Sequence, residues 1–319
     1  MTLRRRISVA LLSTRLLPIL LQILLASMLA TAPAVAQDAV RDAIGNSPEA
    51  KVVAKGDADD LQPAVTRAEF LGRQMYLHDR AAWLATDAML ADRRMRKLKD
   101  RLGGWVTEPS ALGLRVIFFS NDDTPRRLYE IDVDESERLS DAVLESPEPL
   151  SPDHFAQLRA RAQAQQQSYM ACARQYNTVV LPAADGIDVY MMPGFVKDDI
   201  YPLGGYHLYR FDSSGEKLLS TRKFTNGCID LDESIAVPEA TDDGFRPIGM
   251  MFSHLLDPQP TEVHVFVSLY AKNAFAVTTT GNHLLWRVDH GRVSLIDSPA
   301  PTKTADGPSA ASTPPSGAP

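Results

Sequence analysis

Hydrophobic residues recur along this chain in three different patterns, and each pattern predicts a different kind of structure. Near the N-terminus they form an almost continuous run from Leu16 to Ala30. Between about residues 63 and 102 they return every three or four positions, which is the period of a helix with one buried face. From residue 177 onwards they alternate with polar residues, which is the period of a β-strand.

The helical pattern predicts one long helix, or a broken pair of helices, from Pro63 to Leu102. Proline suits the first turn of a helix, and Gly103-Gly104 would end it. We expect His78, one position from the apolar stripe, to be partly buried and hydrogen-bonded rather than a proton shuttle. The stripe itself consists of Leu77, Ala81, Leu84, Ala88, Ala91, Met95 and Leu98.

Two further elements are predicted before residue 177. The segments Leu114–Ser120 and Arg127–Val133 are rich in β-forming residues and are joined by turn-forming ones, which predicts a β-hairpin. A second helix is predicted to begin with Ser151 as its N-cap and Pro152 in its first turn, and to continue to about Tyr176.

The alternating pattern predicts a series of short strands in the C-terminal half. Turn-forming pairs such as Asp185-Gly186 and Gly281-Asn282 separate them, and strands with such short connections run antiparallel. The predicted fold class is therefore α+β, with a long N-terminal helix, a β-hairpin and a second helix packed on a C-terminal antiparallel meander sheet. The predicted strands lie at about 177–182, 187–192, 205–212, 217–224, 262–270, 274–280, 283–288 and 292–296.

The first 36 residues have the features of an export signal. Three arginines at positions 4 to 6 precede the apolar run, and Ala34-Val35-Ala36 offers the small residues that signal peptidase accepts. Pro18 and Gln22 interrupt the run, and the chain has no second apolar stretch of membrane-spanning length. We therefore expect a signal peptide at 1–36 and a soluble, periplasmic or secreted mature protein without stable membrane insertion.

Composition divides the rest of the chain into three parts. Residues 37–62 are small, polar and charged, which predicts a flexible leader. Residues 298–319 are rich in Pro, Ala and Ser, which predicts a disordered tail. The intervening residues 63–297 are expected to form a single α+β domain, with a subdivision near residue 176 left open.

The charge of the mature chain limits the kinds of molecule that we expect it to bind. Removing residues 1–36 takes away four arginines and no acidic residue, which leaves 29 basic against 40 acidic side chains and a net charge of −11. Binding to nucleic acid depends on clustered Lys and Arg that neutralise phosphates. We therefore expect no nucleic-acid partner, and instead an envelope protein or a small ligand.

The chain contains two cysteines, Cys172 and Cys228. In an oxidising compartment a single pair of cysteines is most simply explained by a disulfide. The alternative is that Cys228 is a free nucleophile paired with His207 or His264, because catalysis by a thiol needs an adjacent imidazole.

A metal site is the first chemical hypothesis that the sequence supports. If residues 262–269 formed a strand, Glu262 and His264 would lie on one face, opposite the valines and near the loop that carries His254 and Asp257. Two imidazoles and a carboxylate can ligate zinc or a similar divalent metal, and Asp257 could serve as a further ligand or base. The alternative is that these side chains form a hydrogen-bonded or solvated sheet face.

A second hypothesis concerns ligand binding near Gly204-Gly205. The two glycines permit close backbone approach, and the aromatic residues Tyr206, His207 and Tyr209 follow them. Such a strand could line a groove for a ligand. The alternative is an ordinary strand that begins after a glycine-rich turn.

These observations favour a non-enzymatic function. The sequence contains no nucleophile elbow, phosphate-binding loop or dinucleotide fingerprint. We expect an exported envelope protein that binds or interacts with a partner and needs no cofactor. The alternative is a metal-dependent hydrolase that uses His254, Glu262 and His264.

Overall fold

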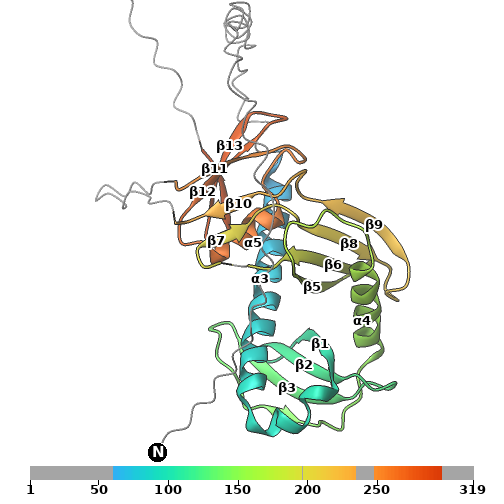
Figure 1. The fold of residues 1–319 in the computed structure, drawn as a ribbon. Coiled ribbons are helices and arrows are strands. Elements are labelled where there is room, and N and C mark those ends of the chain that lie inside the picture. The colour runs from blue at the N-terminus through green and yellow to red at the C-terminus, as the bar shows by residue number, and fades with distance from the viewer. Residues whose placement is uncertain (1–59, 196, 235–247, 297–319) are drawn as a thin grey trace, which may run out of the picture. The chain divides into compact units, whose positions relative to one another are not determined.

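The computed structural model describes residues 60–195, 197–234 and 248–296 (Figure 1). The predicted signal peptide, almost all of the predicted leader and the predicted tail lie outside these residues. The described part of the chain is an α+β structure with three helices and four small, mostly antiparallel sheets. None of the helices in that part is long and apolar enough to cross a membrane.

The long N-terminal helix is present, but it is shorter than predicted. Helix α3 spans Gln62–Ala91, with proline in its first turn and the side chain of His78 buried. The Nδ1 atom of His78 lies 2.7 Å from Oγ1 of Thr107, which confirms that this histidine is hydrogen-bonded. The buried stripe is formed by small and flexible residues, namely Val65, Ala68, Gly72, Met75, Ala81, Ala82, Ala85 and Met89.

The helix ends at Ala91 because Asp92 starts a different local structure. Asp92 has extended backbone angles, and its carboxylate accepts a hydrogen bond from the backbone N–H of Arg94 at 2.9 Å. The basic residues that follow form two 3₁₀ turns, Arg93–Lys97 and Lys99–Arg101, instead of the predicted last turns of the helix. The predicted stop at Gly103-Gly104 is wrong, because both glycines lie inside a strand.

The predicted hairpin is confirmed as part of a four-stranded sheet, which we call the N-terminal sheet. Its strands are β1 (Leu102–Pro109), β2 (Gly113–Ser120), β3 (Arg127–Asp134) and β4 (Val143–Leu144), hydrogen-bonded in that order. The pairings β1–β2 and β2–β3 are antiparallel. One face of this sheet packs against α3. Strand β1 was not predicted.

The second helix, α4, begins as predicted and spans Pro152–Gln165. The hydroxyl of Ser151 accepts a hydrogen bond from the backbone N–H of His154, and His154 Nδ1 accepts one from the N–H of Ser151. Phe155 and Leu158 pack against the face of the N-terminal sheet that α3 leaves open. The alanines of α4 pack on a second sheet, so the helix has apolar contacts on both sides.

The C-terminal half is not the single meander that the alternating pattern predicts. One four-stranded sheet, the central sheet, has the order β5-β6-β8-β9. A two-stranded sheet pairs β7 with β10, and a third, the C-terminal sheet, has the order β11-β12-β13-β14 with β11 parallel to β12. The strands are β5 (Tyr176–Ala183), β6 (Gly186–Pro193), β7 (Ile200–Pro202), β8 (His207–Phe211), β9 (Leu218–Lys223), β10 (Asp230–Asp232), β11 (Met251–His254), β12 (Phe275–Thr279), β13 (Leu284–Asp289) and β14 (Arg292–Leu295).

The segment predicted as a strand at 262–270 is a helix. Helix α5 spans Glu262–Tyr270, with Thr261 as N-cap and Glu262 in its first turn. Seven of its nine residues are buried, so the valines on opposite sides of the helix all contact other apolar residues. Alternating valines therefore reflect a helix enclosed on all sides, and tertiary burial overrides their preference for strands.

Helices α3 and α5 cross at Gly72, in the middle of α3. A Cβ atom added to Gly72 would lie 2.5 Å from Cβ of Val265 and 2.6 Å from the carbonyl oxygen of Glu262. The hydroxyl of Tyr270 donates a hydrogen bond to Asp79 at 2.8 Å, which joins the two helices again at the end of α5. The absence of a side chain at position 72 thus sets how closely the two helices approach.

We expect Gly72→Ala to destabilise the protein by about 1 to 3 kcal/mol, because the added methyl group meets a side chain and a backbone oxygen. At an ordinary helical position the same change would stabilise by about 0.5 to 1 kcal/mol. Urea denaturation gives the free energy of unfolding. Gly281→Ala is the matched control, since nothing lies within 4 Å of the added methyl group there. An equal effect of the two substitutions would contradict this account of the crossing.

Candidate functional site

The four residues that the sequence grouped as a candidate metal site lie close together, but not in the predicted arrangement. His254 ends β11, Asp257 lies in the loop that follows, and Glu262 and His264 belong to the first turn of α5. The prediction of a shared strand face is wrong, because residues 262–270 are helical. The side chains meet because the short loop 255–261 brings the start of α5 back beside the end of β11.

The two histidines contact each other directly. Their ring centroids are 4.8 Å apart and the rings are nearly perpendicular. The Nε2 atom of His254 lies 3.0 Å from Oδ2 of Asp257. The Nδ1 atom of His264 accepts a hydrogen bond from the backbone N–H of Thr261 at 3.1 Å, and it thereby caps the N-terminus of α5.

Arg222, on β9 of the central sheet, completes the cluster. Its guanidinium donates to Oδ1 of Asp257 at 2.8 Å and to Oε1 of Glu262 at 3.3 Å. The hydroxyl of Tyr190, on β6, also donates to Glu262 at 3.3 Å. The cluster therefore joins the central sheet to α5 and to the C-terminal sheet. No pattern in the sequence marks Arg222 as a member of this cluster, because it is 35 residues from Asp257 and 40 from Glu262.

Burial determines the protonation of the cluster. Loss of hydration, together with the neighbouring His254, lowers the pKa of His264 to about 3, so this imidazole is neutral at physiological pH. Burial raises the pKa of Asp257, but the hydrogen bond from His254 and the charge of Arg222 outweigh it, and the pKa lies below its usual value. Burial and the adjacent Glu262 raise the pKa of the Tyr190 phenol.

This geometry suits a structural role better than contact with a substrate. His254 is 3% exposed and His264 is 5% exposed, so neither ring is accessible to a molecule in solvent. Among the residues that the structure describes, no group of three or more His, Cys, Asp or Glu side chains is arranged to hold a metal ion. A metal-dependent hydrolase that uses His254, Glu262 and His264 stays a prediction, because the described residues contain no set of side chains arranged to ligate a metal.

The glycines at 204 and 205 do permit close approach, but the approaching atoms belong to the chain itself. A Cβ atom on Gly204 would lie 2.2 Å from the carbonyl oxygen of Gly227. Gly205 has φ +90°, and a Cβ atom there would lie 2.6 Å from Cβ of Cys172. These glycines therefore allow the segments on either side of the disulfide to pack together.

The three aromatic candidates after these glycines do not point to one surface. Tyr206 is buried in the core that includes α5, and Tyr209 is buried in the core beneath α4. His207 is partly exposed, with its ring centroid 5.3 Å from that of Tyr169. Of the three, His207 alone reaches solvent. The proposed ligand groove at Tyr206, His207 and Tyr209 stays a prediction.

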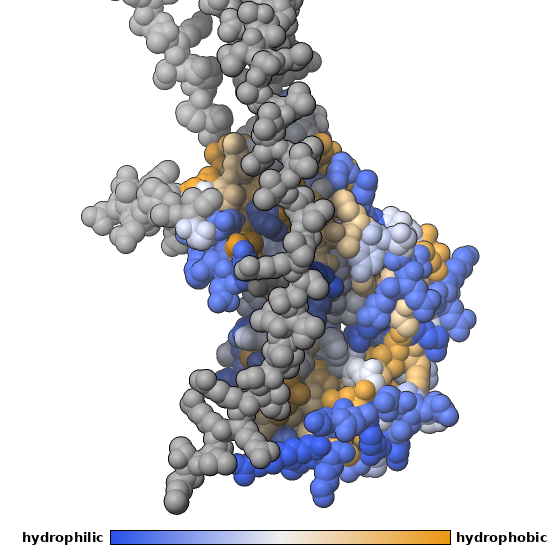
Figure 2. All heavy atoms as spheres, in the orientation of Figure 1, coloured by the Kyte–Doolittle hydropathy of each residue, from blue (hydrophilic) through white to orange (hydrophobic). Residues whose placement is uncertain are grey.

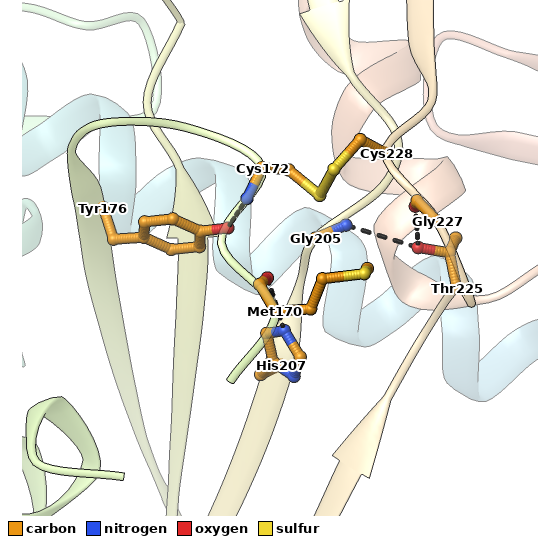
Figure 3. Close-up of a disulfide and its surroundings, with 8 residues drawn as sticks. All are labelled: Met170, Cys172, Tyr176, Gly205, His207, Thr225, Gly227 and Cys228. Atoms are coloured by element: carbon orange, nitrogen blue, oxygen red, sulfur yellow. Dashed lines mark hydrogen bonds between the residues drawn. A yellow bond between two sulfur atoms is a disulfide. The ribbon is translucent and has the colours of Figure 1, made fainter. Parts of the chain in front are cut away.

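The predicted disulfide between Cys172 and Cys228 is present (Figure 3). It joins the loop between α4 and β5 to the loop between β9 and β10, with a Cα–Cα distance of 5.4 Å. Cys172 lies in a loop and not in the helix, because α4, which was predicted to continue to about Tyr176, ends at Gln165. With both cysteines bonded, Cys228 has no thiol that could act as a nucleophile in this structure.

Hydrogen bonds fix the two loops around the disulfide. The backbone N–H of Cys172 donates to the Tyr176 hydroxyl at 2.8 Å. Thr225 accepts from the N–H of Gly205 at 3.3 Å and donates to the carbonyl of Gly227 at 2.9 Å (Figure 3). Hydrogen bonds therefore hold the chain on both sides of the disulfide.

Comparison with known proteins does not identify a family. No protein-family model matches the chain, and neither the curated proteins nor the solved structures contain a match to it.

The buried histidines predict loss of stability in acid. Burial lowers the pKa of His78 to about 4 and, together with His254, that of His264 to about 3, whereas an unfolded histidine titrates near 6.5. Below pH about 6.5 the unfolded chain therefore binds protons that the folded chain does not, and the protein becomes less stable as the pH is lowered. Each of these two histidines should lower the free energy of unfolding by about 2 kcal/mol when the pH is lowered from 8 to 5.

His264→Gln isolates one of these contributions, because glutamine can cap the helix without titrating. Urea denaturation at pH 8 and pH 5 should show the pH-dependent loss reduced by about 2 kcal/mol in this variant. His283→Asn, at an exposed turn, is the control and should keep the full loss. The same pH dependence in His264→Gln and in the wild type would refute the assignment to His264.

The disulfide should contribute roughly 4 kcal/mol to stability, because it closes a loop over a sequence separation of 56 residues. We expect the Cys172→Ser, Cys228→Ser double variant to lose that amount in urea denaturation. The wild-type protein should fall to the same value when it is measured with a reductant, and the variant should not respond to reductant. A wild type whose stability is unchanged after verified reduction would disprove this contribution.

Proposed function

We propose that this protein is exported to the cell envelope and acts there by binding another protein. The N-terminal sequence supports export, as does the pairing of the two cysteines of the chain in a disulfide. The enclosed histidines favour binding over catalysis, because a general base must reach the proton that it removes from a substrate.

The observation that carries the proposal is the exposed apolar surface around β11. Four large side chains lie within residues 248–256 and remain in contact with solvent: Ile248 (36% exposed), Met251 (68%), Leu255 (63%) and Leu256 (40%). We call these four residues the β11 patch. Figure 2 shows apolar surface at the upper end of the molecule, where Figure 1 places β11 and β12.

The composition of this segment separates it from an ordinary protein surface. Residues 248–256 contain no Asp, Glu, Lys or Arg, and the one histidine among them, His254, is buried. Single exposed apolar side chains are common on soluble proteins, but a run of them without charge is typical of an interaction site. The β11 patch is therefore the surface that we assign to partner binding.

Site-specific photocrosslinking in intact cells tests this assignment. A photoreactive amino acid at position 251 or 255 should give a discrete protein adduct in the envelope fraction, because the group reacts only with molecules in contact. Position 112 is the matched control, since Leu112 is 58% exposed but lies between β1 and β2 of the N-terminal sheet. No adduct at 251 and 255, or the same adducts at 112, would overturn the proposal.

A further inference from the structure

The edges of a β-sheet carry unpaired backbone groups, and proteins usually protect them from pairing with other chains. In this protein the helices protect three edges. Helix α3 lies against β5. It also supplies Glu69, which accepts a hydrogen bond from the N–H of Val293 on β14 at 2.8 Å. Helix α4 supplies Arg161, which donates to the carbonyl of Trp105 on β1.

Two further edges are protected by their own sequence and length. On β9, the register with β8 shifts near Leu219, and the strand ends in Arg222 and Lys223. A bulge and charged side chains both oppose the addition of another strand. Strand β4, at the edge of the N-terminal sheet, has two residues only.

Strand β11 has none of these protections among the residues that the structure describes. It is the terminal strand of the C-terminal sheet and is paired on one side, with β12. It has no proline, Asp, Glu, Lys or Arg, and its one histidine, His254, is buried. Met251, whose side chain points away from the core, is 68% exposed. An open edge with apolar side chains is a template for a further strand.

We propose that β11 of a second copy of the chain occupies this edge and pairs with it antiparallel about a two-fold axis. This pairing rests on the proposed function, since it names the partner that binds there. In such a pair the two identical strands face each other in opposite directions, so the pairing joins the two C-terminal sheets into one continuous sheet of eight strands.

The distribution of charge permits a second copy at this edge and opposes one elsewhere. The mature chain carries a net charge of −11, so two copies repel each other over most of their surfaces. Like charges opposite each other in a sheet are destabilising, and a two-fold pair brings each residue near its own counterpart. The uncharged segment 248–256 is free of this repulsion. It is a surface at which an acidic protein can approach its own copy.

The side chains also suit self-pairing. In a pair centred on Phe252, the two phenylalanines face each other, and Met251 of each copy faces Ser253 of the other. Phe252 is only partly buried, and its ring packs edge-on against Phe275 at 5.8 Å between centroids. A second Phe252 would cover the side of this ring that the C-terminal sheet leaves open, and would extend the apolar core across the axis.

Sedimentation velocity of the purified mature chain over a range of concentrations tests the inference. The wild type should show a dimer that dissociates on dilution. Met251→Lys should raise the dimer dissociation constant at least about tenfold, because it puts two cations into the paired strands. Leu112→Lys changes an apolar residue that is 58% exposed between β1 and β2 of the N-terminal sheet, and this variant should dimerise like the wild type. Circular dichroism establishes that both variants are folded.

A wild type that stays monomeric at all concentrations overturns the inference, as does equal dimerisation by Met251→Lys. Photocrosslinking at position 251 then distinguishes this failure from failure of the proposed function. An adduct with the mass of two chains supports the second copy. An adduct with a different protein overturns the self-pairing but leaves the proposed function in place, and no adduct at 251 or 255 overturns both.

Discussion

The close crossing of α3 and α5 at Gly72 is the contact on which the rest of the structure depends. Helix α3 contacts both the N-terminal and the C-terminal sheets. Its first half, with Val65 and Met75, belongs to the core that includes α5 and the C-terminal sheet. Its second half, with Ala81 and Ala85, belongs to the core of the N-terminal sheet. A wider separation of α3 and α5 at Gly72 would disturb the packing of both cores, because both include side chains of the same continuous helix, α3.

Local signals in the sequence were sufficient for the elements whose ends are set by neighbouring residues. Pro63 and Ser151 mark the starts of α3 and α4, and the turn formers after Ser120 mark a hairpin. Non-local contacts decided the rest. The valines of α5 fit a strand or a buried helix equally well, and only the packing on all sides of that helix distinguishes the two. Turn signals between strands likewise do not determine which strands share a sheet.

The candidate site also shows that local sequence signals do not determine non-local contacts. Sequence proximity was enough to suggest that His254 and His264 lie near each other, although the strand geometry offered as the reason was wrong. Arg222 could not be found in this way, because an ion pair between β9 and a loop far along the chain produces no recognisable spacing of residues in the sequence. The glycines at 204 and 205 did mark a close approach. Their pattern did not reveal that the disulfide loops, rather than a ligand, occupy the space.

The buried cluster and the exposed β11 patch each have one residue on strand β11, namely His254 and Met251. Side chains alternate along β11, so Phe252 and His254 face the core while Met251 and Ser253 face outward. His254 is hydrogen-bonded to Asp257, which Arg222 of the central sheet holds in turn. This network fixes the end of β11 from within. A pre-ordered strand loses little conformational entropy on pairing. In the proposed dimer, the cluster that the sequence suggested as a catalytic centre supports the binding edge from within.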